Sequence, residues 1–229
     1  MANQRRRLAL SVARKDLRIE RRSHVLTAQI LPFSLVTMVL FAFALDATSV
    51  LQRVAPGLVW LAVLFSMMIV VQRAFAVETA DGALDALRSA GADMSGVFFG
   101  KFIALVVQLI IVEGALWIAA VLLYGIELRL GGIVLLVTSS ISATCGLAAI
   151  GTIYGGLASG IQGRESLLPL LVLPVASPVL IGATRSAEAA FGIGGTVASE
   201  GWPWLGLLTV FAVAFVVVGS FAFGPLVDD

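Results

Sequence analysis

The sequence alternates between long apolar stretches and short polar segments, and the apolar stretches set the expected architecture. A helix needs about 20 apolar residues to cross a bilayer, and six windows reach or approach that length. Because backbone groups in hydrocarbon must be hydrogen-bonded within the segment, each window is expected to be a helix. The pattern predicts an all-α integral membrane protein with one membrane domain (1–229) and a six-span bundle (24–227). The expected spans are His24–Leu45, Gly57–Val77, Val97–Tyr124, Gly132–Ala158, Leu167–Ala183 and Leu205–Val227.

The fifth window differs from the others because it is short and contains Pro169, Pro174 and Pro178. Each proline removes an amide donor and leaves a carbonyl one turn earlier without its usual partner. We expect this span to be bent and locally broken, and broken spans in transporters often border a path or a moving joint. A static kink is the alternative. Any gating is therefore expected at these prolines.

The residues before the first span form a basic amphipathic segment. Arg5–Arg22 carries eight basic residues and no helix breaker. On a helical wheel six of these cations share one face, while leucine, valine and isoleucine fill much of the rest. This predicts a retained interfacial helix over 1–23 with its basic face on anionic headgroups of the lipid bilayer; a simple topology anchor is the alternative. Asp16 and Glu20 fall on its apolar side, where they are either solvated or meet a basic partner.

The segments between the spans differ in basic residues, and this difference sets the expected orientation. The side with more basic residues is expected in the cytoplasm. This predicts that both termini are cytoplasmic and that the protein lies in the plasma (inner) membrane of a bacterial or archaeal cell. The largest external loop is then Arg185–Pro203. The cytoplasmic side collects the N-terminal cluster plus Arg73, Arg88, Lys101 and Arg164, and the other side has Arg53, Arg129 and Arg185.

Composition supports the membrane assignment and excludes several functions. The chain is 59% hydrophobic and 13% charged, with a net charge of +1, whereas a soluble domain is about 25% charged. Nothing in this balance points to nucleic acid. The single cysteine, Cys145, and the single histidine, His24, provide no pair of classical nitrogen or sulfur ligands, so we expect no metal site and no cofactor bound by this chain itself.

A polar segment, Glu78–Lys101, interrupts the apolar pattern between the second and third spans. Asp81-Gly82 indicates a turn, helical spacing follows, and Gly91 can end a short helix in a left-handed conformation. We expect a cytoplasmic helix that fits the groove of a partner. Its apolar anchors would be Leu84 and Leu87, and its polar rim Asp81, Asp85 and Arg88. The alternative is an ordinary re-entry loop whose leucines rest on lipid.

The polar segment resembles the first cytoplasmic loop of type-2 ABC exporter permeases. The shared pattern is carried by Glu78, Gly82, Ala83, Leu84, Asp85, Leu87, Gly100 and Lys101. In that family the loop contains the coupling helix that contacts the ATPase. The resemblance therefore implies that the coupling residues are Glu78, Asp81, Gly82, Leu84, Asp85, Leu87 and Arg88.

A second stretch narrows the resemblance to the haem exporter B family of cytochrome c maturation. Gly151–Thr184 has a Gly-rich end of the fourth span, a turn at Arg164, and a fifth span with Pro174 and Pro178, and Lys15–Leu26 is also similar. This implies a permease subunit that couples ATP hydrolysis by a separate ATPase to haem export or to release of a haem-loaded chaperone. The implied partners are a CcmA-like ATPase, CcmC-like and CcmD-like haem-handling membrane subunits, a CcmE-like haem chaperone and a second copy of this chain. Haem is the implied cargo of the complex, and ATP binds the partner.

Other polar and small residues within the spans suggest packing and one buried acid. Gly151, Gly155, Gly156 and Gly160 have the small-xxx-small spacing of close helix contacts or, alternatively, of a sliding surface between protomers. Glu113 lies well inside the third span, where a charge is by default a functional hypothesis. Four tryptophans are expected in an aromatic belt near the outer ends of the spans. They are Trp60, Trp117, Trp202 and Trp204.

Two enzymatic interpretations of the sequence are excluded because residues that they require are missing. A phosphate-binding loop ending at Gly100-Lys101 would need glycine at Ser95 and serine or threonine at Phe102. An intramembrane serine protease would need a base near its serine, and His24 lies at the edge of the first span. We expect a non-catalytic protein. Two rival functions stay open: a permease for a drug, lipid or polysaccharide, and a non-transporting scaffold for haem-handling subunits.

Overall fold

The structure is a computed structural model that describes residues 2–45, 48–80, 82, 86–87, 89–158 and 164–228. The described residues contain seven α-helices, no strand, a π-helical turn at Leu26–Ile30 and two short 3₁₀ turns at Ile193–Gly195 and Ala198–Gly201. The helices are α1 (Ala2–Ser23), α2 (Leu31–Ala44), α3 (Thr48–Ala80), α5 (Met94–Tyr124), α6 (Leu130–Ala158), α7 (Arg164–Phe191) and α8 (Trp202–Asp228).

Six helical segments are long and apolar enough to cross a membrane, which confirms the predicted all-helical, six-span pattern for the described residues. The largest shift in a boundary is at the second span, which begins at Thr48 and not at Gly57. The segments are Leu26–Ala44, Thr48–Glu78, Met94–Tyr124, Leu130–Ala158, Pro169–Phe191 and Ala198–Leu226.

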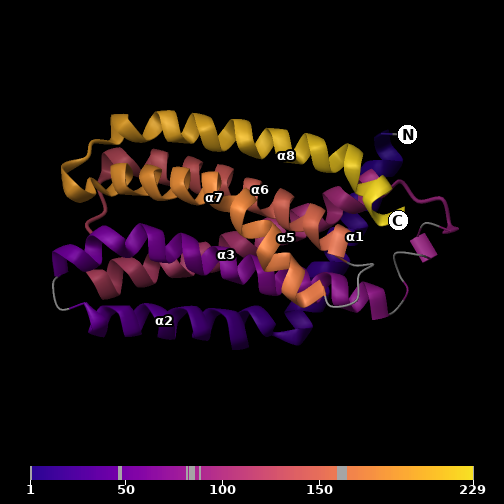
Figure 1. The fold of residues 1–229 in the computed structure, drawn as a ribbon, viewed down its shortest axis with the longest axis horizontal. Coiled ribbons are helices and arrows are strands. Elements are labelled where there is room, and N and C mark those ends of the chain that lie inside the picture. Colours follow the sequence, from indigo (N-terminus) through magenta and orange to yellow (C-terminus); the bar gives the residue numbers. More distant parts are fainter. Residues whose placement is uncertain are drawn as a thin grey trace.

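The fifth span is longer and more regular than its prolines predict. Helix α7 runs without interruption to Phe191, with three prolines inside it, and it bends along its length (Figure 1). The predicted local break is therefore wrong: each proline removes one backbone hydrogen bond, and the remaining ladder holds the helix together. A gating role for Pro169, Pro174 and Pro178 stays a prediction.

The predicted external loop Arg185–Pro203 is also wrong in its first part. Its first seven residues continue α7, because Ala187, Ala189 and Ala190 are buried against the bundle. On the outer side of the same turn Arg185 Nη1 donates to Glu188 Oε2 at 2.8 Å. Good helix formers with one buried and one solvated face favour continuation of the helix.

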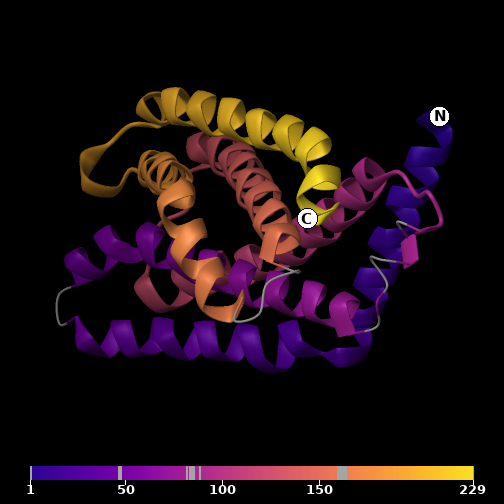
Figure 2. The same cartoon turned by 45° about the vertical axis from the view of Figure 1, so that its right-hand side comes forward.

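The spans lie side by side along the long axis of the molecule, and both chain termini lie at one end of it (Figure 1). We call this the terminal end. The described residues of segment 82–91 lie at the same end, and α1 crosses this end at a steep angle to α2 (Figure 2). The change of direction occurs at His24, a non-glycine residue with a φ of 53°. Helix α6 packs against α3, α5, α7 and α8, so it is central, while α2 and α8 are largely exposed.

The glycine face of α6 packs inside this chain. A Cβ at Gly151 would lie 2.6 Å from Met67 Sδ, and one at Gly156 would lie 2.6 Å from the ring of Phe223. Only glycine leaves room for α3 and α8 at these positions. Gly155 meets α3 in the same way, and Gly160 lies outside the described residues.

Two of the four tryptophans are not in an interfacial belt. Trp60 is 1% exposed and Trp117 is 9% exposed, so both belong to the core, whereas Trp202 is 48% exposed. The prediction fails for the first two because a span that is apolar on all sides does not indicate which side faces its neighbours.

Candidate functional site

The terminal end is organised by the packing of α1 against the beginning of α5. A Cβ at Gly100 would lie 2.6 Å from Val12 Cβ and 2.7 Å from the carbonyl oxygen of Ala9. At Gly96, one turn earlier, a Cβ would lie 3.1 Å from Leu8 Cδ2. These two glycines form a flat surface on which the apolar side of α1 rests. This surface gives Gly100, the first residue of the Gly-Lys pair, a structural role.

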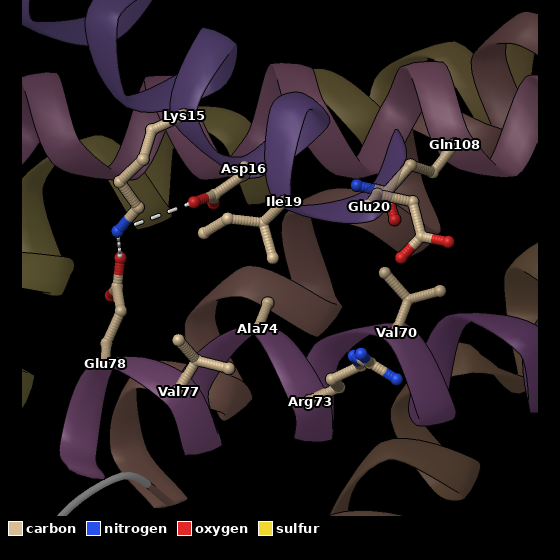
Figure 3. A pocket seen from close by; sticks show the side chains of 10 residues that line it. All are labelled: Lys15, Asp16, Ile19, Glu20, Val70, Arg73, Ala74, Val77, Glu78 and Gln108. Atoms are coloured by element: carbon tan, nitrogen blue, oxygen red, sulfur yellow. Dashed lines mark hydrogen bonds and ion pairs between the residues drawn. The ribbon is translucent and has the colours of Figure 1, made fainter. Parts of the chain in front are cut away.

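Four charged side chains from three helices meet beside this contact, and we call them the charge cluster (Figure 3 shows three of them). Lys15 Nζ lies 2.7 Å from Glu78 Oε1 and 3.6 Å from Asp16 Oδ1. Lys101 Nζ lies 3.3 Å from Asp16 Oδ2 and 3.0 Å from Glu78 Oε2, the latter an ion pair without hydrogen-bond geometry. The cluster joins α1 to the end of α3 and the start of α5.

Burial differs strongly within the charge cluster. The side chains of Lys101 and Glu78 are 3% and 2% exposed, and that of Asp16 is 10% exposed. A buried charge has lost its hydration, so each of these groups depends on its partners. Lys15 is 43% exposed and closes the cluster on the solvent side.

Lys15 remains protonated over the whole physiological pH range. Partial burial lowers its pKa, but the hydrogen bond and the charge of Glu78, with a contribution from Asp16, raise the pKa above its ordinary value overall. A raised pKa of a cation stabilises the fold below the unfolded-state pKa of about 10.4, and this contribution is lost only as the pH rises through the folded-state value. The Lys15 pairs are therefore not a switch near neutral pH.

The charge cluster also reaches the central and C-terminal spans. The ammonium of Lys101 lies 4.4 Å from the ring centroid of Phe75, a cation–π contact. Phe75 in turn contacts the ring of Phe223 on α8 at 6.4 Å and occupies the space beside Gly155 on α6. Packed groups therefore connect the terminal end to α6 and α8.

The described parts of segment 82–91 have the features of a short capped helix. Gly82 and Gly91 have φ values of 59° and 68°, the left-handed region that favours glycine. Ala86 N donates to Gly82 O, and Ala92 N donates to Leu87 O at 3.0 Å, the six-residue closure typical of a helix C-terminus. Gly91 therefore has the left-handed conformation that the sequence predicted for it. Asp93 then caps α5 by accepting from Ser95 N, and it pairs with Arg5 of α1 at 2.7 Å.

Of the predicted coupling residues, the structure describes Glu78, Gly82 and Leu87. Leu87 is half-buried and packs against the core of its own chain, and Glu78 is buried in the charge cluster. Ala86 and Ala90 are exposed on the same segment. Asp81, Leu84, Asp85 and Arg88 lie outside the described residues. A direct contact between Glu78 and a partner would first require its ion pairs to open.

The partners of Glu78 were not predicted from the sequence, although one signal pointed to them. Asp16 stands on the apolar side of α1, and of the two interpretations of this residue, the one with a basic partner is confirmed by Lys101. The other acid on that side, Glu20, accepts from the backbone amide of Leu26 at 2.5 Å and so fixes the junction between α1 and the first span.

Glu113 lies in a second buried polar site, between α5 and α6. Its Oε1 accepts from Trp117 Nε1 at 3.1 Å, and its Oε2 accepts from Thr144 Oγ1 at 2.7 Å. The sequence did not identify these partners, because Thr144 is 31 residues away on another helix. Both carboxyl oxygens are satisfied, so this acid links two spans.

Removing the Thr144 hydroxyl should destabilise the protein in a way that depends on Glu113. We expect Thr144→Val to cost about 1–3 kcal/mol, since a buried carboxyl oxygen loses its donor. In a Glu113→Leu background the same change should cost much less. The measurement is a double-mutant cycle on thermal unfolding in detergent. Thr152→Val is the matched control, because that buried hydroxyl donates to Ala148 O of its own helix. Equal costs in both backgrounds would contradict the link.

Fold and site together define the class of the chain: an all-helical, multi-pass membrane protein whose N-terminal helix is bound to the end of its second span and the start of its third. Comparison with known sequences is more specific. The sequence model of the CcmB protein family matches residues 7–228. The chain therefore belongs to the CcmB protein family.

Individual relatives agree with the family match. Heme exporter protein B of Haemophilus influenzae is 30% identical over 213 residues, which are 90% of this chain and 95% of that protein. Heme exporter protein B of Paracoccus denitrificans is 31% identical over 170 residues, 73% of this chain and 76% of that protein. The protein of the same name from Pseudomonas aeruginosa is 28% identical over 208 residues, with 90% of both chains covered. The resemblance inferred from the fifth span is confirmed.

Proposed function

We propose that this chain is the membrane permease subunit of an ABC transporter complex for cytochrome c maturation. It couples ATP hydrolysis on a separate CcmA-like ATPase to haem export or to release of a haem-loaded CcmE-like chaperone. The observation that supports this proposal is the family match over residues 7–228, together with relatives named heme exporter protein B. The chain itself is non-catalytic, and haem is the cargo of the complex, which includes CcmC-like and CcmD-like subunits and a second copy of this chain.

Segment 82–91, which we call the lever, is the element on which the ATPase pushes. Leu87 anchors it on the chain's own core, while Ala86 and Ala90 lie exposed for a partner. A lever needs both a fixed and a free side. Its two ends continue into α3 and α5, which the charge cluster binds to α1. Motion of the segment is thus transmitted to three helices at once and, through Phe75, to α6 and α8.

The terminal end faces the cytoplasm in this proposal. The basic residues of α1 lie there, as do Arg73 and Lys101, whereas Arg53, Arg129 and Arg185 belong to the opposite end. This distribution follows the positive-inside rule. It supports an orientation in which the lever lies on the side of the membrane where ATP is available.

Substitutions in the lever test the proposal. The chain is co-expressed with its ATPase, and the ATPase recovered in the purified complex is measured together with its hydrolysis rate. We expect Leu84→Ala and Leu87→Ala to reduce recruitment or stimulation roughly 30-fold, the effect of losing an interface anchor worth about 2 kcal/mol. Since Leu87 also packs internally, Ala86→Arg provides a variant that obstructs docking from an exposed position.

Leu122→Ala is the matched control, because this leucine is 77% exposed and lies near the end of α5 remote from the lever. It should recruit the ATPase normally. If the ATPase binds all three lever variants as it binds the wild type, the lever assignment is wrong. If the ATPase binds these variants normally and haem proteins still co-purify with them, the chain is better described as a non-transporting scaffold.

A further inference from the structure

A cavity of about 420 Å³ lies at the end of the bundle opposite the termini. Its volume is within the roughly 300–1,000 Å³ of pockets that bury small ligands. It is bounded by the start of α3, the connection between α5 and α6, and the end of α7. The residues that line it include Gln52, Arg53, Glu127, Arg129 and Phe191.

We call the cavity at the end opposite the termini the outer cavity. Its walls are held by specific contacts. Gln52 Nε2 donates to Gly125 O at 2.9 Å and so fixes the start of α3 to the end of α5. The guanidinium of Arg129 occupies the space beside Gly192 where a side chain would stand. The Phe191 ring packs on Trp117 with 5.2 Å between centroids. The cavity is therefore preformed.

The charge of the outer cavity favours an anion. Arg53 and Arg129 both line it, and within the described part of the chain neither forms an ion pair. Two guanidinium groups that no described carboxylate pairs with present several donors suited to phosphate oxygens. Glu127 also lines the cavity and reduces this attraction.

Exposed apolar side chains flank both arginines. Leu128 and Leu130, on either side of Arg129, are 57% and 86% exposed, and Val50 and Val54 near Arg53 are 45% and 36% exposed. Exposed aliphatic groups next to a cationic cavity, at the end of membrane spans, match a ligand with a phosphate and acyl chains. We propose that the outer cavity binds the phosphate of an anionic phospholipid headgroup.

Native mass spectrometry of the delipidated full chain in detergent tests the site. The protein is titrated with phosphatidylglycerol and, separately, with phosphatidylcholine of the same acyl chains. We expect about tenfold tighter binding of phosphatidylglycerol. The double variant Arg53→Gln/Arg129→Gln should lose this preference. The single variant Arg53→Gln should weaken the preference, and it leaves the Arg129 contact with Gly192 undisturbed. Glu127→Gln should tighten phosphatidylglycerol binding severalfold, a gain that a purely structural role would not produce.

Arg185→Gln is the matched control, since this exposed arginine of α7 pairs with Glu188 and does not line the cavity. Equal binding of the two lipids, or an Arg185→Gln effect as large as that of Arg53→Gln, would overturn the proposal. Inorganic phosphate is added as a competitor. If it displaces phosphatidylglycerol at equal concentration, the ligand is a soluble anion and the lipid assignment fails. Because the cavity is remote from the lever, ATPase recruitment by these variants should stay normal, so this proposal and the transporter proposal fail separately.

Discussion

Gly100→Val should release the N-terminal helix from the bundle. The new side chain would collide with Val12 Cβ and with the carbonyl oxygen of Ala9, and a backbone oxygen cannot move without moving α1. Overpacking typically costs about 1–3 kcal/mol. The expected result is about 5- to 150-fold faster tryptic cleavage within α1, because cleavage follows the population of the opened state.

The control for this substitution is Gly114→Val on the same helix. A Cβ at Gly114 would meet no atom within 4 Å, so the same change adds the same atoms without a collision. Its cleavage rate should match that of the wild type. Unchanged cleavage in Gly100→Val would show that α1 does not rest on Gly100. In the proposed mechanism, a released α1 should also weaken the response of ATP hydrolysis to the permease.

Lys101→Met should be the most destabilising change in the charge cluster. It leaves Glu78 and Asp16 buried with only Lys15, and breaking a buried pair by removing one partner costs about 3–5 kcal/mol. At about 2–4 °C per kcal/mol for a chain of this size, the thermal midpoint in detergent should fall by roughly 6–20 °C.

Two further variants separate burial of charge from loss of volume. Lys15→Met removes the half-exposed ammonium and should cost less than about 1 kcal/mol, as surface pairs do. The double variant Glu78→Leu/Lys101→Met replaces a buried pair with apolar groups and should recover much of the lost stability. If the double variant loses as much stability as Glu78→Leu and Lys101→Met lose in sum, Glu78 and Lys101 are not coupled and the cluster has another role.

Local features of the sequence were sufficient for much of the fold. Apolar stretches of membrane-spanning length predicted the number of spans, and the left-handed conformation of Gly91 was also predicted. These features depend on the residues themselves and their near neighbours, since a span must satisfy its backbone internally whatever surrounds it. The prolines of α7 were misleading, because each one removes a single backbone hydrogen bond and the remaining ladder keeps the helix continuous.

Contacts between distant residues could not be predicted in this way. Asp16 and Lys101 are 85 residues apart, and Glu113 and Thr144 are 31 apart. A helix that is apolar on nearly every side gives little information about its rotation, so its pairings depend on how it packs. For the same reason Trp60 and Trp117 were predicted at the interface and lie in the core.

The sequence by itself determined that this chain crosses a membrane as helices, that a basic helix precedes the spans, and that a polar segment separates the second span from the third. Hydrocarbon length and local chemistry suffice for each of these. Only the tertiary structure decided that Glu78 is buried and not free for a partner, that Gly100 and Lys101 bind α1, and that Arg53 and Arg129, which form no ion pair among the described residues, line the same cavity. Each of these depends on which helix faces meet, a property of packed neighbours and not of any single segment.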